Sequence, residues 1–305
     1  MKRNWFAVAL CVSIALATID HPVAVSANTD SGLVPAQQAA VAGSQPPPQA
    51  ASAGNTRLDF YDDFDYPDTS FLAFHGAGGK TWNASLWYKA NAASPKNFSI
   101  SNSVLTINNN AISTIQNATP FAGRTWQGGY FEARIYCAAH CGFYLGSYAW
   151  AKMSGQSCQA ADCETNRQAA GKQLDSQYGG ANEIDIIEAY GTAPKAGAFT
   201  LHRGGMGAGQ HGYGAPDDHI AKSAKFNAPL IRNWHTYGLL WTKTTLYWYV
   251  DNQLTASAPA YRSTWQPSFM IISVAPDGWS NTSKGTADDE VITKVDWVKV
   301  WEPAK

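Results

Sequence analysis

Short runs of alternating apolar and polar residues, separated by turn residues, fill the chain from residue 57 onward. Residues 104–107 form one such run and lead into three asparagines, which predicts a strand followed by a turn. Residues 244–250 predict a strand that ends at Asp251-Asn252, with its partner strand beginning near Gln253. Residues 269–274 are continuously apolar, as expected for a strand buried between two sheets.

The same region contains no 12-residue segment with convincing helical periodicity. Many short strands with regular turns predict an all-β fold, either a sandwich or a jelly roll. One stretch, residues 153–180, is polar and rich in Gln and Gly. A loop of this length is usually functional or disordered. We therefore expect it to form either one wall of a cleft or a surface insertion.

The first 56 residues differ in composition from the rest. Lys2-Arg3, an apolar stretch and a small-residue site at 25–27 predict a signal peptide over residues 1–27. Residues 28–56 are rich in Ala, Gln, Pro, Ser and Gly, which predicts a disordered linker. One domain remains, over residues 57–303. We expect a secreted or periplasmic protein that has no membrane attachment once the signal is removed.

Charge and aromatic content narrow the class of partner. The net charge of −1 and the absence of a basic run argue against a nucleic-acid or anionic-membrane partner. The chain has 12 Trp and 14 Tyr, most of which we expect to fill the core. A surplus of rings on a concave face would suit stacking on sugars, whose C–H faces are apolar.

Four cysteines follow the predicted signal peptide: Cys137, Cys141, Cys158 and Cys163. Export favours disulfides, and of three connectivities we prefer the local pairs Cys137–Cys141 and Cys158–Cys163. A zinc site is the alternative, although only His140 lies among the four cysteines.

The most informative stretch is residues 182–191, which reads Asn-Glu-Ile-Asp-Ile-Ile-Glu-Ala-Tyr-Gly. Its three carboxylates, Glu183, Asp185 and Glu188, are separated only by isoleucines. The β-branched residues favour a strand, whereas acids are poor strand formers and repel one another on one face. A functional reason for the acids is therefore favoured over a half-exposed strand with merely solvated carboxylates.

Strand geometry decides where these acids point. Side chains alternate between faces, so Glu183 and Asp185 share a face and Glu188 would point to the other one. One extra residue in a β-bulge would restore Glu188 to the shared face, and bulges often lie beside active sites. The run predicts a bulge at Ile186-Ile187 and a row of three acids, two of them placed to flank one bond.

The Glu-Ile-Asp-Ile-Ile-Glu run resembles the signature of glycoside hydrolase family 16, in the bulged form typical of laminarinase-like, agarase-like and carrageenase-like members. The resemblance spans roughly residues 58–302, and its motifs follow in the family's order. The other matching segments are Tyr61-Asp62-Asp63-Phe64, Gly129 to Ile135, Thr200-Leu201-His202, Trp234 to Trp241 and Val295 to Val300.

The resemblance implies a β-jelly roll of two curved antiparallel sheets, with substrate across the concave one. It also implies that Glu183 is the nucleophile and that Glu188 protonates the leaving oxygen and then activates water. Asp185 would hydrogen-bond the nucleophile and keep Glu188 protonated. Acids on one strand face have little room to separate, which favours a retaining over an inverting mechanism.

Further candidates follow from position and from the same resemblance. The candidate substrate contacts are Asn182, His202, Arg203, Trp126, Tyr148, Trp150 and Trp279. For His202 and Trp126 a purely structural role is the alternative interpretation. The family's structural calcium would correspond to Asp63 and Asp296 here. No cofactor is expected for catalysis.

The leading hypothesis is an exported, retaining endo-β-glycosidase that acts as a monomer on a polysaccharide, with β-1,3-glucan or mixed β-1,3-1,4-glucan as first choice. A galactan such as agarose or carrageenan is the second choice. A transglycosylase would use the same acids. A non-catalytic, lectin-like carbohydrate-binding module is the alternative from another class, although it would not need both glutamates at this spacing.

Overall fold

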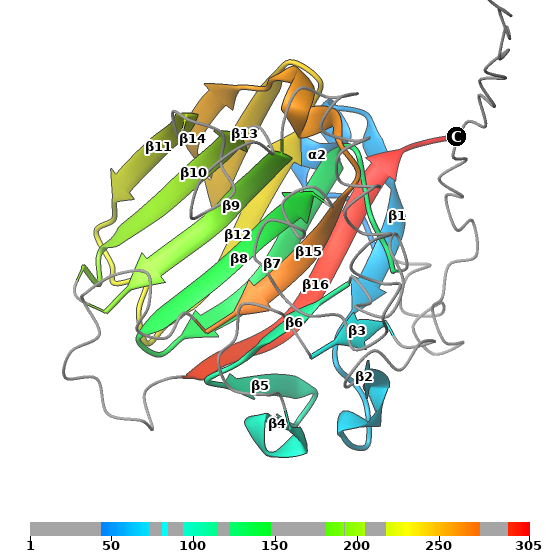
Figure 1. Ribbon diagram of the computed structural model, residues 1–305, viewed down its shortest axis with the longest axis vertical. Helices are drawn as coiled ribbons and strands as arrows, with labels where there is room; N and C mark the ends of the chain where they lie inside the picture. Colours follow the sequence, from blue (N-terminus) through cyan, green and yellow to red (C-terminus); the bar gives the residue numbers. More distant parts are fainter. Residues whose placement is uncertain are drawn as a thin grey trace, which may run out of the picture.

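The computed structural model describes residues 44–73, 81–84, 94–114, 123–147, 181–191, 193–204, 218–274 and 292–305. In these ranges the protein is a sandwich of two eight-stranded sheets (Figure 1). The described parts contain one short α-helix, α2 (Pro48–Ser52), and three 3₁₀ turns, η1 (Thr69–Phe71), η2 (Pro95–Asn97) and η3 (Arg262–Trp265). The all-β prediction is confirmed.

The first sheet has the strand order β14-β13-β12-β7-β16-β5-β4, and β1 pairs with β16 outside this path. Its strands are β1 (Asn55–Asp62), β4 (Phe98–Ser101), β5 (Val104–Asn108), β7 (Gly129–Cys137), β12 (Trp234–Trp241), β13 (Thr245–Val250), β14 (Gln253–Pro259) and β16 (Ile292–Pro303). The predicted hairpin is β13–β14. Asp251 and Asn252 both have positive φ, as its tight turn requires.

The second sheet has the order β11-β10-β9-β8-β15-β6-β3-β2. Its strands are β2 (Leu72–Ala73), β3 (Trp82–Asn83), β6 (Ala111–Ser113), β8 (His140–Ser147), β9 (Ala181–Tyr190), β10 (Ala196–Gly204), β11 (Asp218–Lys225) and β15 (Ser268–Ser273). Every residue of β15 is buried, so the strand expected from the continuous apolar run at 269–274 is present. The acidic run is β9, which lies between β8 and β10.

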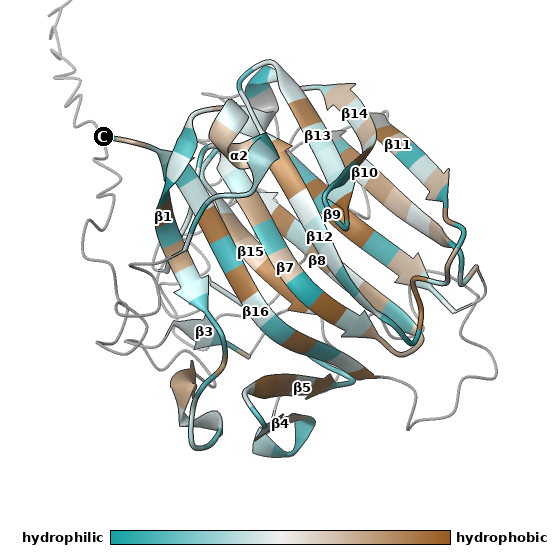
Figure 2. Cartoon of the chain, turned by 180° about the vertical axis from the view of Figure 1, so that it is seen from behind, coloured by the Kyte–Doolittle hydropathy of each residue, from teal (hydrophilic) through white to brown (hydrophobic). Residues whose placement is uncertain are grey.

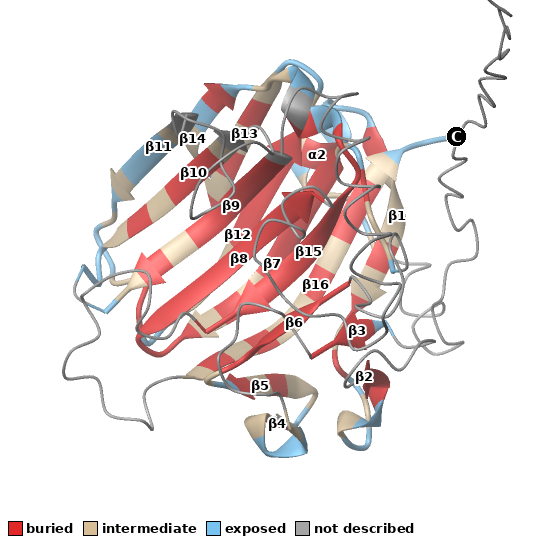
Figure 3. Cartoon of the chain, viewed as in Figure 1, coloured by how far each residue is buried: buried red, intermediate tan, exposed pale blue. Residues whose placement is uncertain are grey.

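One hydrophobic core fills the space between the sheets. Alternation along each strand builds it: on β7, Phe131, Ala133 and Ile135 are buried in the core, whereas Arg134 and Tyr136 are only half-buried. Hydrophilic and hydrophobic residues therefore alternate along β7 and β16 when the molecule is seen from behind (Figure 2). The central strands are buried along most of their length, and the edge strands β11 and β14 are more exposed (Figure 3).

The described part of the chain includes residues before the predicted boundary at residue 57. Helix α2 lies within the segment assigned to the disordered linker, and its Ala50 packs on Tyr130, Leu240 and Trp301. Gln49 Nε2 donates to the hydroxyl of Tyr130 at 2.6 Å. Proline in the first helical turn favours this helix, but one buried alanine leaves too weak a pattern to be recognised in the sequence.

The predicted Cys137–Cys141 disulfide is not formed, because both cysteines are buried free thiols. Cys137 ends β7 and Cys141 is the second residue of β8, so each continues the inward row of its own strand. Both pack as small hydrophobic side chains, and burial raises the pKa of Cys137 well above its usual value. Cys158 and Cys163 lie outside the described residues, as do the predicted signal peptide and the 153–180 stretch.

Within the described ranges no helix is both long enough and apolar enough to cross a membrane.

Candidate active site

The bulge predicted in the acidic strand is present. Asp185 pairs with Thr200 of β10 and Glu188 pairs with Ala198, so two residues of β9 face one residue of its neighbour. The pairing with β8 shifts at the same place, between Phe143 and Tyr144. β9 therefore carries one residue more than both flanking strands, which is the definition of a β-bulge.

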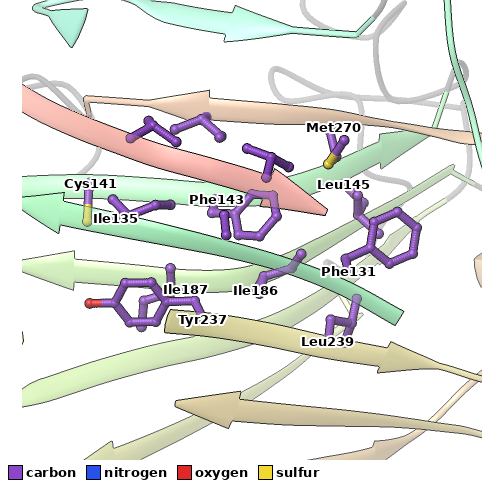
Figure 4. Close-up of a cluster of buried hydrophobic side chains, with 14 of the residues drawn as sticks. Phe131, Ile135, Cys141, Phe143, Leu145, Ile186, Ile187, Tyr237, Leu239 and Met270 are labelled. Carbon is purple, nitrogen blue, oxygen red and sulfur yellow. The ribbon is translucent and has the colours of Figure 1, made fainter. Parts of the chain in front are cut away.

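The bulge sends Ile186 and Ile187 to the same side of the sheet. Both side chains are fully buried in the core beside Tyr237 and Leu239 (Figure 4). Strict alternation would have put one of the two isoleucines on the opposite face and Glu188 in the core. Glu188 is instead half-buried on the face of Glu183 and Asp185, because two successive inward residues restore the parity.

His202 completes the acidic face from the next strand. It stands opposite Glu183 in the pairing of β9 with β10, and its Nε2 lies 3.1 Å from Oδ2 of Asp185. Glu183, Asp185 and His202 each place one polar side-chain atom in a cluster, and these three atoms lie within 4.8 Å of one another. Glu183 and Asp185 are buried, so their charges interact with little screening by solvent.

The surroundings of Glu188 raise its pKa into the neutral range. Burial first, and then the negative charge of Asp185, raise the pKa of Glu188 to about 7. A hydrogen bond from Tyr190 and the charge of His202 act in the opposite direction. An acid with this pKa carries its proton in about half of the molecules at pH 7, which suits a group that must both give and take a proton.

His202 is held as a cation by the acids around it. Burial alone would lower its pKa, but the hydrogen bond with Asp185 and the charges of Asp185, Glu183 and Glu188 raise the pKa to about 10. Glu183, Asp185 and His202 also form the group in the described chain whose spacing would suit a metal ion. The protonated imidazole already offsets one of the two carboxylate charges, and a metal would have to displace its proton.

Replacing His202 should therefore shift the pH dependence of the site. In His202→Asn the positive charge that lowers the pKa of Glu188 is lost, so that pKa rises. We expect the basic limb of the pH–rate profile to move to higher pH and kcat to fall about tenfold.

The matched control is His235→Asn, because His235 bonds Asp251 Oδ2 at 2.7 Å on the other sheet. The control should leave the basic limb in place. A limb that stays fixed or moves to lower pH in His202→Asn would contradict this assignment.

Tyr190 is a site residue that the sequence interpretation missed. It lies two residues after Glu188 on β9, so it shares the face of Glu188 beyond the bulge, and it hydrogen-bonds the Glu188 carboxyl. Burial raises its pKa, with a further contribution from the charge of Glu188, so Tyr190 keeps its proton and acts as a donor. Counting alternate positions onward from Glu188 would have identified it.

Two predicted substrate contacts lie in the interior instead. Asn182 is fully buried with its Nδ2 3.5 Å from Oγ of Ser268, because alternation places it on the inward face with Ile184. Trp126 is a core residue that donates to Asp59 and makes edge contacts with Phe60 and Phe131. Of the two roles considered for Trp126, the structure therefore favours the structural one, and Asn182 does not join the acids.

The structure describes no side chain for the remaining predicted contacts. Tyr148, Trp150 and Trp279 fall in ranges that the structure does not describe, and Arg203 is described only as a backbone position of β10.

Calcium binding by Asp63 and Asp296 stays a prediction, and in this structure both side chains have protein partners. Asp296 is ion-paired with Arg134, and Asp63 accepts a hydrogen bond from the hydroxyl of Tyr61. Calcium takes about six to eight oxygen ligands, and a guanidinium on one of two carboxylates opposes a cation there. The neighbouring Asp62 is occupied too: it is buried and accepts hydrogen bonds from Phe64 N, Tyr66 Oη and Trp82 Nε1.

Together, the fold and the site define a β-sandwich protein with a row of acids on one strand of its second sheet. Residues 170–299 match the model of Glycosyl hydrolases family 16. The match covers less than half of the chain, and it agrees with the resemblance inferred from the motifs.

Two relatives match parts of this chain. Over 119 residues the chain is 26% identical to an endo-1,3-1,4-beta-glycanase of Rhizobium meliloti, a match that covers 39% of this chain and 23% of the relative. Over 95 residues it is 35% identical to a glucan endo-1,3-beta-glucosidase of Cryptopygus antarcticus, covering 30% of this chain and 32% of the relative. The matches thus span less than a third of each relative's length.

The structure of an endo-beta-1,3-glucanase from Pyrococcus furiosus superposes with a TM-score of 0.57 at 16% identity, covering 82% of this chain and 95% of that chain. At this identity the likeness concerns the fold, and it confirms the jelly-roll prediction.

Proposed function

We propose that this protein is an exported, retaining endo-β-glycosidase that hydrolyses a β-1,3-glucan or a mixed β-1,3-1,4-glucan. The observation that carries the proposal is the bulge of β9, which brings Glu183, Asp185 and Glu188 to one face. The two outer residues then offer an ionised carboxylate and a protonated carboxyl group to a single glycosidic bond. Retaining glycosidases use such a pair with the carboxyl groups about 5–5.5 Å apart.

In the first step Glu183 attacks the anomeric carbon while Glu188 gives its proton to the glycosidic oxygen. The bond between that carbon and oxygen breaks, the leaving sugar departs as an alcohol, and Glu183 holds the remaining sugar as an ester. In the second step Glu188, now a carboxylate, takes a proton from water. The water oxygen bonds the anomeric carbon and Glu183 is released as a carboxylate.

Asp185 and His202 act as a pair beside the two glutamates. The negative charge of Asp185 keeps the proton on Glu188 until the leaving oxygen accepts it. The His202 cation bonds Asp185 and interacts electrostatically with both glutamates, which limits the repulsion among three clustered acids. Tyr190 holds the carboxyl of Glu188 in one orientation through its hydrogen bond.

The choice of a glucan rests on the relatives, which are named as a 1,3-1,4-β-glycanase and an endo-1,3-β-glucosidase. A galactan remains the second choice. The export signal predicted from residues 1–27 fits a polymeric substrate, since such a polymer is met outside the cell.

The proposal is tested by incubating the purified protein with laminarin, lichenan, agarose, carrageenan and xyloglucan and measuring new reducing ends. We expect release from laminarin or lichenan, with products of several sizes early in the reaction, as endo action requires. Reducing ends from agarose or carrageenan alone would move the substrate to a galactan. Binding to a glycan that is never shortened would replace the enzyme by the lectin-like alternative.

A further inference from the structure

A tryptophan of the opposite sheet reaches across the core to the acidic strand. Nε1 of Trp248, on β13, donates a hydrogen bond of 2.8 Å to the main-chain carbonyl oxygen of Asp185. The bond is buried, and the Trp248 side chain is fully inaccessible to solvent. Asp185 is the residue immediately before the bulge, so this bond holds the strand at the point where its pairing shifts.

The carbonyl of Asp185 needs this partner because of where it lies. A bulge interrupts the ladder of hydrogen bonds between strands and leaves backbone groups without their regular partners. A buried carbonyl without a donor destabilises the conformation that exposes it, and water does not reach the middle of a packed core. Without the indole N–H, a flatter strand that turns this carbonyl back toward its neighbours would be favoured.

The position of Trp248 is fixed independently of the site. It pairs with Leu239 of β12 on one side and with Ala256 of β14 on the other, and the β13–β14 pairing shifts directly after it. Its backbone is therefore fixed within its own sheet. The donor is in place before any substrate binds, which is what precise placement of a reacting group requires.

We propose that Trp248 is a positioning residue of the site: its indole N–H fixes the bulge of β9 and thereby holds Glu188 on the face of Glu183 and Asp185. Trp248 contacts no reacting atom. It acts through the backbone of Asp185, and its loss would let Glu188 drift from its place beside Asp185. This inference rests on the proposed glycosidase function.

The test separates the N–H from the bulk of the ring. Replacing Trp248 by benzothienylalanine through nonsense suppression keeps the size and shape of the side chain and replaces N–H by sulfur. Trp248→Phe removes both the donor and part of the volume. The control is Trp241→Phe, because Trp241 is a buried tryptophan of β12 in the same sheet whose ring packs against Phe131.

Both changes at Trp248 should lower kcat by about 10- to 100-fold, as expected for a misplaced acid, while KM stays within about twofold of wild type. The basic limb of the pH–rate profile should move to lower pH by about half a unit, because Glu188 separates from the negative charge of Asp185. Trp241→Phe should lower the melting temperature without moving the limb.

Unchanged kcat and an unchanged limb in the benzothienylalanine protein would overturn the proposal. An equal shift of the limb in Trp241→Phe would do so as well, because it would show a general packing effect.

A second readout needs no substrate. The carboxyl carbon of Glu188 can be titrated by NMR in protein labelled with ¹³C-glutamate, with its signal assigned through Glu188→Gln. Among the described residues, the charged and titratable groups that face Glu188 are Asp185 and Tyr190 of its own strand and His202 of β10. The midpoint should fall in the benzothienylalanine protein, and an unchanged midpoint would overturn the proposal even if no polysaccharide is cut.

Discussion

Glu183→Gln will lower kcat by about five orders of magnitude, because the amide cannot form the glycosyl ester on which the second step depends. Binding of the polysaccharide should be largely kept, since the amide has nearly the shape of the carboxylate. The change removes one negative charge beside His202 and introduces no new bulk. The measurement is kcat and KM on the substrate found in the polysaccharide panel, with binding followed by calorimetry.

Glu302→Gln is the matched control for this variant. Glu302 lies on β16 of the other sheet and pairs with Arg57, so its replacement loses a carboxylate of the same kind away from β9. It should keep wild-type kcat. Residual activity of Glu183→Gln within about a hundredfold of wild type would show that another group attacks the anomeric carbon.

Glu188 should dominate the pH dependence. Its pKa is raised from 4.5 to about 7, so below pH 7 it mostly carries the proton that the leaving oxygen needs, and above pH 7 it does not. Activity should therefore fall as the pH rises through about 7. Measuring kcat/KM on the free enzyme from pH 4 to 9 checks this, and a profile that stays flat through pH 8 would contradict the role of Glu188.

Glu188→Gln should lower kcat on the polysaccharide by about three orders of magnitude and abolish the basic limb, because the amide has no proton to give. With an aryl glycoside whose leaving group needs no protonation, the rate of the first step should fall much less in this variant. Added azide should then restore turnover, since it attacks the sugar ester without a general base. A failure of azide to accelerate this variant, with Glu183 intact, would argue against the assignment of the acid/base.

Features of the site that depend on residues of one strand can be predicted from the sequence, whereas contacts between residues far apart in the sequence cannot. The bulge could be inferred because its evidence lies within one strand: three acids among isoleucines have no common face unless an extra residue restores their parity. His202 could be placed near them through its motif, and the structure brings it to hydrogen-bonding distance of Asp185. Local periodicity also sufficed for the β13–β14 hairpin and for β15.

Interactions between the sheets could not be predicted in this way. Trp248 meets Asp185 across 63 positions of sequence, and nothing in the pattern of either strand specifies that contact. The sequence leaves both a sugar-stacking and a core role open for Trp126, and only the packing of Phe60 and Phe131 around it decides. Helix α2 was missed since a single buried alanine carries its docking.

The stereochemistry of the first product tests the central claim most directly. The proposed mechanism requires the carboxyl groups of Glu183 and Glu188 to lie about 5–5.5 Å apart, which leaves no room for a water molecule to attack between them. The sugar would then pass through an ester on Glu183. Proton NMR in the first minutes of hydrolysis should show the β-anomer before mutarotation sets in. An α-anomer as the first product would mean direct attack by water across a wider gap, and would contradict the account.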